Sequence, residues 1–203
     1  MIKCNVTVCG IVAQQAAMRT SKEGKPFLAV PVKVVVPARN GSDKTIEISV
    51  RKDGSEADIA DYRVGERIEV TGTLTLKQRS DKLYFNLSAD DVDFSPKTDE
   101  DAVTGEMEFR GKVGKRIDER TDKKGNPYLQ FSAHSTEKVG ESFESIWVRF
   151  IRFDAEREAW LQPGCRVQVK GEVSLSAYND SLNISCKVAE MSEAVKPEYN
   201  NND

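Results

Sequence analysis

The residue types that most often carry metal or nucleophilic chemistry are scarce in this chain. Its thiols are Cys4, Cys9, Cys165 and Cys186, and its one imidazole is His134. No two cysteines have the Cys-x-x-Cys spacing of a zinc knuckle, and no glycine-rich phosphate loop joins a strand to a helix. We therefore expect reduced cysteines that fill strand positions, no metal, no cofactor and no enzymatic activity.

The composition is that of a soluble protein with small cores. Charged residues make up 31% of the 203 residues and hydrophobic residues 38%, with a net charge of −3. The chain has no apolar run of about 18 residues that could span a bilayer. Its first residues, MIKCNVTVCGIV, alternate apolar and polar, which indicates a strand and not a secretory signal. A cytoplasmic location is the default expectation.

One phrase occurs twice in the sequence. TSKEGKPFL begins at Thr20 and TDKKGNPYL begins at Thr121, 101 positions later. The same offset aligns Gly10 with Gly111, and further on VGERIEVTGTLTL is echoed by PGCRVQVKGEVSL. A chain of this length can form one large domain or two small ones. The repeat favours two.

Each copy has the same expected order of elements. A strand, a turn with Gly-x-Pro, two more strands, a short helical stretch, and two strands joined by a polar hairpin follow one another. The helical stretches are expected at 56–64 and 154–163. Five strands with a helix between the third and fourth is the plan of the OB-fold, although periodicity alone also fits an SH3-like barrel. The expected fold class is all-β with short helices, as two tandem OB-folds.

The expected boundaries follow from composition. Residues 1–94 form the first domain, 95–107 an exposed acidic linker, 108–190 the second domain, and 191–203 a polar disordered tail. Each copy carries nearly equal numbers of basic and acidic residues, so the acidic excess lies in the linker and the tail.

The second copy resembles the bacterial single-stranded DNA-binding proteins. The resemblance rests on the order and spacing of GKVGKRIDERTDKKGNPYLQFSAHS, SIWVRFIRFD and LQPGCRVQVKGEVSLSAYNDSLNISCKV. It implies a protein that binds single-stranded DNA without sequence preference in replication, repair or recombination. Family members surround DNA with four OB modules, so a chain with two modules is expected to form a homodimer. The polar end at 198–203 lacks the family's apolar tip, so partner recruitment through such a tip is not implied.

The resemblance also implies which side chains stack on bases. By motif match these are Trp147, Phe153 and Tyr178, with Phe143 as a further candidate. Stacking on a ring and contact with phosphate are common to every nucleotide, which suits binding without sequence preference. Candidates for phosphate contacts are Lys112, Lys115, Arg116, Arg149, Arg152 and Lys170 in the second copy, and Arg19, Lys22, Lys33, Arg51, Lys77 and Arg79 in the first.

The first copy departs from this pattern. In the sequence alignment Ile48 falls at the position of Trp147, Gly54 near that of Phe153, and Gln78 and Arg79 at that of Tyr178. We therefore expect the second copy to bind DNA more strongly, while the first contributes charge, pairing surface or a path for the strand.

Other interpretations stay open. An aromatic residue on a barrel strand often belongs to the core, although Ile146 and Val148 can fill the core beside Trp147 because they point to the opposite face. Trp160 is expected to plug the barrel end, and many basic residues are ordinary surface charges. An alternative function is a protein-interaction or assembly module of a replication or mobile-element apparatus with little DNA affinity. A hydrolase or nuclease lacks a visible catalytic cluster.

Overall fold

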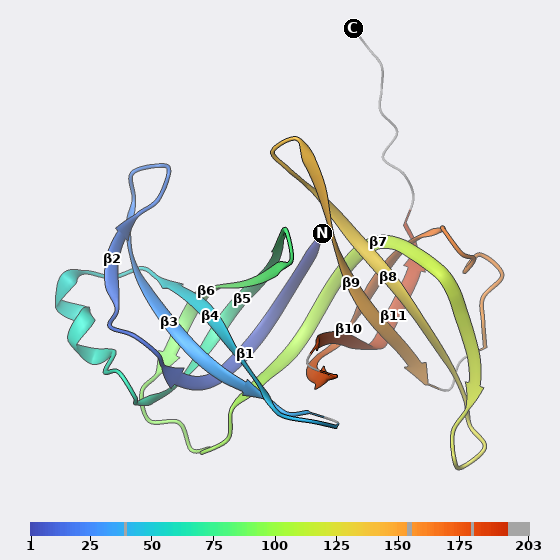
Figure 1. Ribbon diagram of the computed structural model, residues 1–203, viewed down its shortest axis with the longest axis horizontal. Helices are drawn as coiled ribbons and strands as arrows, with labels where there is room; N and C mark the ends of the chain where they lie inside the picture. Colours follow the sequence, from blue (N-terminus) through green and yellow to red (C-terminus); the bar gives the residue numbers. More distant parts are fainter. Residues whose placement is uncertain (39, 154–155, 180, 195–203) are drawn as a thin grey trace, which may run out of the picture.

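The computed structural model of the chain describes residues 1–38, 40–153, 156–179 and 181–194 (Figure 1). Its regular elements in that part of the chain are eleven strands and one short 3-10 helix. They are β1 Ile2–Val12, β2 Ala17–Thr20, β3 Pro26–Val36, β4 Lys44–Lys52, η1 Glu56–Asp61, β5 Arg67–Arg79, β6 Lys82–Asp93, β7 Ala102–Thr121, β8 Pro127–Val139, β9 Ser142–Phe153, β10 Arg166–Tyr178 and β11 Ser181–Glu193.

The strands pair in two closed rings. The first barrel, β1 to β6, closes through the pairs β1–β5, β5–β6, β6–β4, β4–β3 and β3–β1. The second barrel, β7 to β11, closes through β7–β10, β10–β11, β11–β9, β9–β8 and β8–β7. In both rings the pair between the third and fifth long strands is parallel and the others are antiparallel. The nearly all-β fold with a closed five-stranded barrel confirms the predicted OB-type fold class.

The repeated glycines explain why the two rings close in the same way. A Cβ added at Gly10 would lie 2.4 Å from the Lys33 carbonyl oxygen, and one at Gly111 would lie 2.2 Å from the His134 carbonyl oxygen. Only glycine allows the first and second strands to approach so closely at these two equivalent points. Gly24 and Gly125 have φ of 80° and 88°, as the turns of the repeated phrase require.

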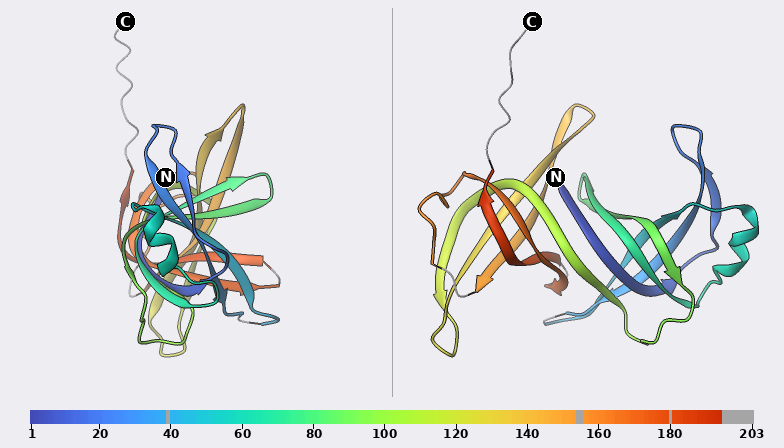
Figure 2. Two further views of the ribbon diagram at one scale, coloured as in Figure 1. Left: turned by 90° about the vertical axis from the view of Figure 1, so that its left-hand side faces the viewer. Right: turned by 180° about the vertical axis from the view of Figure 1, so that it is seen from behind.

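The two barrels are joined by antiparallel pairing of β1 with β7, so they lie side by side (Figures 1 and 2). Asn5 pairs with Glu106, which is its own repeat counterpart 101 residues later. On either side of this pair, Cys4 pairs with Met107 and Val6 pairs with Gly105. Each of these residues thus pairs with the repeat counterpart of the other. A self-pairing of this kind relates the two copies by a local twofold axis, as in an isologous dimer interface.

The expected exposed linker is wrong for residues 102–107. These residues begin β7, and Met107 is fully buried. Residues 102–105 pair only with β1 of the other barrel, whereas 106 and 107 also pair with β10 of their own barrel. The strand therefore depends on partners that are distant in the sequence. The predicted division into two domains stays a prediction.

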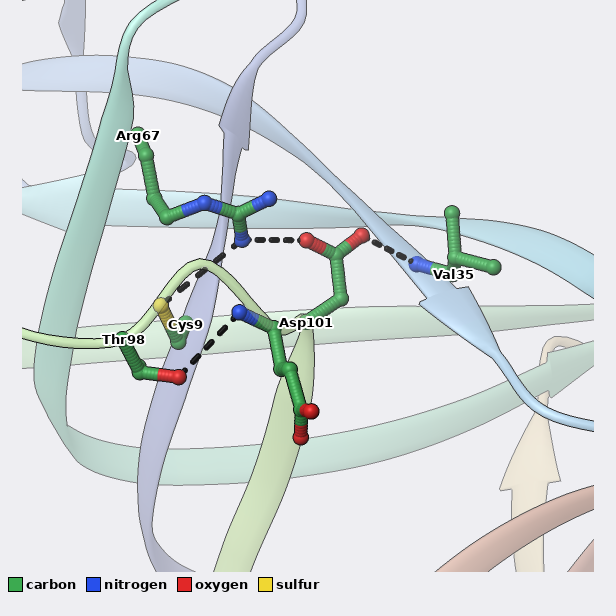
Figure 3. A network of polar contacts seen from close by, with 6 residues as sticks. Cys9, Val35, Arg67, Thr98 and Asp101 are labelled. Carbon is green, nitrogen blue, oxygen red and sulfur yellow. Dashed lines mark hydrogen bonds and ion pairs between the residues drawn. The ribbon is translucent and has the colours of Figure 1, made fainter.

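A polar network fixes the chain where it enters β7 (Figure 3). The Arg67 guanidinium of β5 forms an ion pair with Asp101, whose side chain is 9% exposed. The other carboxylate oxygen of Asp101 accepts a hydrogen bond of 2.7 Å from the Val35 backbone N–H of β3. Asp101 therefore holds the start of the second barrel against two strands of the first, and the ion pair raises the pKa of Arg67.

The helical expectations are corrected in part. Residues 56–61 form η1, a 3-10 helix. Of the helix expected at 154–163, residues 154 and 155 lie outside the described part of the chain, and 156–163 are irregular, with turns at 159–160 and 163. Trp160 is partly buried against the core, as expected of a plug. The predicted tail is wrong for 191–193, which end β11, and its residues 195–203 lie outside the described part of the chain. No helix among the described residues is long and apolar enough to cross a membrane.

The cores of the two barrels differ in side-chain size. In the second barrel the Phe150 ring lies 4.8 Å from the Phe109 ring and 5.1 Å from the Phe131 ring, centroid to centroid. The repeat counterparts of these three residues are Val8, Val30 and Val50, which are fully buried in the first barrel. The first barrel adds Tyr62, which follows η1, is buried, and meets Phe94 edge to face.

Candidate nucleic-acid interface

The outer side of β9 presents a row of aromatic and basic side chains. Alternation along the strand places Phe143, Trp147, Arg149 and Phe153 on one side, while Ile146, Val148 and Phe150 face the core. Tyr178 is exposed at the end of β10. Phe143, Trp147, Phe153 and Tyr178 are 70%, 54%, 47% and 49% exposed, so none of them fills the core. We call these four residues with Arg149 the aromatic face.

The Trp147 ring is supported on one side and open on the other. Trp147 stands opposite His134 of β8, and their ring centroids are 4.6 Å apart at 45°. A Cβ added at Gly114 of β7 would lie 3.1 Å from Trp147 Cζ3, so the indole packs over a single residue of β7 that has no side chain. This support orients the ring while leaving more than half of the side chain exposed.

The imidazole of His134 favours its neutral form. Burial lowers the pKa of His134, and the positive charge of Lys112, its partner on β7, lowers it further. Its Nδ1 is buried and makes no hydrogen bond to any described residue. A neutral ring beside the indole adds an apolar surface near pH 7 and no competing charge.

The other end of the row holds a second aromatic pair. Phe153 stands opposite Tyr128, with ring centroids 5.9 Å apart, and Lys187 Nζ of β11 lies 5.9 Å from the Phe153 ring centre. A base that stacked on this ring would therefore bring its phosphate near a cation.

Tyr178 and Arg149 share a cavity of about 370 Å³. The other lining residues are Ile151 of β9, Ser176 of β10, and Asn183 and Ser185 of β11. A cavity that combines a phenol ring, a guanidinium and small polar groups can hold a base and its phosphate together. The structure thus places Tyr178 beside Arg149 of the β9 row, although the two residues lie 29 positions apart in the chain.

The predicted phosphate-binding cations of the second barrel fall into two groups. Lys112, Lys115 and Arg149 are exposed and make none of the ion pairs found among the described residues. Lys170 lies 3.7 Å from Glu108 and Arg116 lies 3.8 Å from Asp118. Arg152 forms an ion pair with Glu158 and shares the core-facing side of β9 with Phe150, so it lies outside the aromatic face.

The cations of the first barrel are spread over several strands and do not converge on one aromatic row. Lys33 stands opposite Glu47, and the Arg51 guanidinium lies 4.2 Å from the centre of the Phe27 ring. Lys77 stands opposite Tyr84, Arg79 ends β5, Arg19 lies on β2 and Lys22 lies in the turn after it.

The register corrects one detail of the sequence alignment. Lys33 is the repeat counterpart of His134, and it pairs with Glu47, so Glu47 and not Ile48 occupies the position of Trp147. Ile48 is fully buried in the core. A shift of one residue moves a strand's side chains to the other face, which is why the alignment gave the wrong one. The conclusion that the first barrel lacks this indole stands.

Sequence reasoning missed four residues near the interface: His134, Tyr128, Lys187 and Tyr84. The first three became visible only through strand register, because each contacts an aromatic side chain on a neighbouring strand. Tyr84 had a local signal. It alternates with buried Phe85 and shares the outer side of β6 with Asn86 and Ser88.

No group of three or more His, Cys, Asp or Glu residues that could hold a metal ion occurs in the described part of the chain. The four cysteines form no disulfide, and burial raises the pKa of the Cys4 and Cys186 thiols to about 12. Thiols with such pKa values are poor nucleophiles near neutral pH.

Comparison with known proteins finds only distant similarity. No protein-family model and no curated protein matches the chain. Among solved structures, the wild-type single-stranded DNA-binding protein from Thermus aquaticus is similar over 97% of this chain and 94% of that one, at 17% identity and a TM-score of 0.48. A deletion mutant of that protein is similar over 98% of each chain, at 16% identity and a TM-score of 0.47.

The mitochondrial single-stranded DNA-binding protein Rim1 from S. cerevisiae is similar over 43% of this chain and 91% of its own, at 18% identity and a TM-score of 0.35. At these identities and TM-scores the matches carry no conclusion about function.

Proposed function

We propose that this protein binds single-stranded DNA through the aromatic face of its second barrel, without sequence preference and without enzymatic activity. The observation that carries the proposal is that all four aromatic side chains expected to stack on bases are exposed, three of them in one row of β9 with Arg149 between Trp147 and Phe153. A row of exposed rings leaves apolar surface in contact with water, which is unfavourable. Stacked bases would cover that surface.

The spacing of the row leaves room for several nucleotides. Side chains on one side of a strand recur about every 6.6 Å, because each residue advances the strand by about 3.3 Å. Trp147 and Phe153 lie six residues apart, so their Cα atoms are separated by about 20 Å along the strand. Several nucleotides can lie between them, and Arg149 stands within that interval to contact phosphate.

The phosphate contribution is expected to be moderate. The second barrel has nearly equal numbers of basic and acidic residues, and several of its cations already pair with carboxylates. Stacking contributes about 1 to 3 kcal/mol per base, so two or three rings can supply several kcal/mol. We propose that replication, repair or recombination supplies the exposed strands, and that a homodimer presents four OB modules to them.

A direct binding assay tests the proposal. Fluorescein-labelled oligo-dT is titrated with the full chain at low salt and its anisotropy is followed, with duplex DNA of the same length and oligo-rU as competitors. The double variant Trp147→Ala/Phe153→Ala is expected to lose most of the affinity. Trp160→Phe is the matched control, because Trp160 packs against the core and lies off the aromatic face.

The alternative function predicts another outcome. The first barrel places Glu47 where the second has Trp147, which favours an assembly role for at least that barrel. An assembly module would leave oligo-dT unbound by wild-type protein at low salt while forming a stable complex with a protein partner. That result would overturn the DNA-binding proposal.

A further inference from the structure

A groove of about 780 Å³ lies where the two barrels meet. β4 pairs with β6 only at Ile48–Arg51, and β9 pairs with β11 only at Arg149–Ile151. Before these short parallel ladders the strands separate, so each barrel is open at one end. The groove is formed by both openings together, because the β1–β7 pairing turns them toward each other.

The floor of the groove is formed by equivalent, apolar positions of the two barrels. Ile46 and Phe85 of the first barrel correspond by register to Ile146 and Ile184 of the second. All four line the groove and are at most 8% exposed. Equivalent positions of the two barrels therefore build one apolar floor.

The rim of the groove is not the same in the two halves. The second barrel contributes Trp147, whose counterpart is Glu47. The first barrel contributes Tyr84, whose counterpart by register is Asn183. Tyr84 is 44% exposed and takes part in none of the ring contacts found among the described residues. Each barrel thus brings one exposed ring to the same groove, from a different strand.

The charges around Tyr84 suit a base better than a phosphate inside the groove. Lys44 and Lys82 line it, but Glu47 and Asp81 line it as well. Lys77 stands directly opposite Tyr84 on β5 and Arg79 follows on the same strand, so cations lie next to the ring. A strand with its base on Tyr84 would have basic side chains nearby for its phosphates.

We propose that Tyr84 is a base-stacking residue of the first barrel, and that a single strand leaving Trp147 crosses the junction of the barrels through this groove. The inference rests on the proposed function of the aromatic face and extends it. One OB module occupies about 4 to 16 nucleotides. A short oligonucleotide therefore fills the second barrel alone, and a longer one reaches Tyr84.

The test compares two lengths of oligo-dT, about 8 and about 30 nucleotides, on full-length wild type, Tyr84→Ala, Tyr84→Phe and Trp147→Ala. Tyr84→Ala is expected to weaken binding of the long oligonucleotide by about 5- to 150-fold and to leave the short one unchanged. Tyr84→Phe keeps the ring and is expected to bind like wild type. Trp147→Ala is expected to weaken both lengths.

The outcomes separate this inference from the proposed function. Wild type that binds neither length overturns both. Wild type that binds both, with Tyr84→Ala equal to wild type on the long oligonucleotide, overturns the role of Tyr84 and leaves the aromatic face standing. Equal weakening of both lengths by Tyr84→Ala also overturns the route through the groove.

A photo-crosslink gives a second readout that does not depend on a variant. A long oligonucleotide containing 5-iododeoxyuridine is expected to form adducts with the peptides that carry Trp147 and Tyr84, identified by mass spectrometry. Adducts on the Trp147 peptide without any on the Tyr84 peptide would contradict the proposed path.

Discussion

The two barrels share a strand plan and differ in what they show to solvent. Equivalent positions carry Trp147 and Glu47 on the third long strand, and Tyr178 and Arg79 at the end of the fourth. Equivalent core positions are buried and apolar in both barrels, but the side chains differ in size, since three phenylalanines of the second barrel correspond to three valines of the first. The same backbone plan therefore tolerates different cores, and it carries different side chains on the outer faces of the two barrels.

The two barrels are related by a local twofold axis, but their outer faces are not equivalent. A symmetric pair of barrels would offer two equal sites, whereas here one half has a row of rings and the other has mainly charges, with Tyr84 as its exposed ring at the junction. In the proposed complex, a strand that reached both halves would therefore meet two different surfaces.

The largest effect on stability is expected at the ion pair that joins the two barrels. Asp101→Ala removes the partner of Arg67 and the acceptor of the Val35 N–H, and should destabilise the protein by about 3 kcal/mol because a partly buried cation and a backbone N–H both lose their partner. Asp101→Asn keeps an acceptor and should cost less. Denaturant unfolding measures both, and a wild-type midpoint for Asp101→Ala would show that the network does not fasten the barrels.

The next effect concerns the aromatic face. Trp147→Ala should weaken oligo-dT binding by about 1 to 3 kcal/mol, through loss of one stacked base. Glu47→Ala at the equivalent position of the first barrel is the matched control and should not weaken binding. Equal losses for the two variants would erase the distinction between the barrels.

The comparison can also be tested by adding an aromatic ring to the first barrel. Glu47→Trp places an indole opposite Lys33, where the second barrel has Trp147 opposite His134. It also removes a negative charge, so affinity for long oligo-dT should rise by about 1 kcal/mol. Isothermal titration measures the change, and an unchanged or lower affinity would mean that more than this side chain separates the two barrels.

A smaller effect separates unpaired from paired cations. Arg149→Ala should reduce the slope of log affinity against log salt by about 0.7, the value for one phosphate contact on a single strand. Arg152→Ala should change the slope less, because its guanidinium already pairs with Glu158. Binding isotherms at four salt concentrations give both slopes, and the reverse ranking would reject the assignment of Arg149.

The smallest expected effect is pH-dependent. Because the pKa of His134 is lowered in the folded protein, the unfolded chain takes up the proton first as pH falls. His134 therefore favours folding above its ordinary pKa of about 6.5 and loses that contribution below it. Thermal melts from pH 7.5 to 5 should show a smaller decline for His134→Gln than for wild type. Parallel curves would contradict this.

The sequence was sufficient for features that depend on local pattern. The repeat gave the order of strands in both barrels, and alternation around Ile146, Trp147 and Val148 predicted the outward indole correctly. Features that depend on distant pairing could not be predicted. The β1–β7 ladder turns residues 102–107 from an expected linker into a strand, and register replaces Ile48 by Glu47 as the counterpart of Trp147. The pairing of Arg152 with Glu158 likewise depends on how the chain folds after β9.

The emission of Trp147 tests the central claim most directly. The protein has two tryptophans, so Trp160→Phe leaves Trp147 as the single reporter. Its emission is expected to be quenched saturably by oligo-dT at low salt and restored by high salt, as a stacked indole requires. Oligo-dT that binds, as shown by anisotropy, without changing this emission would contradict stacking on Trp147.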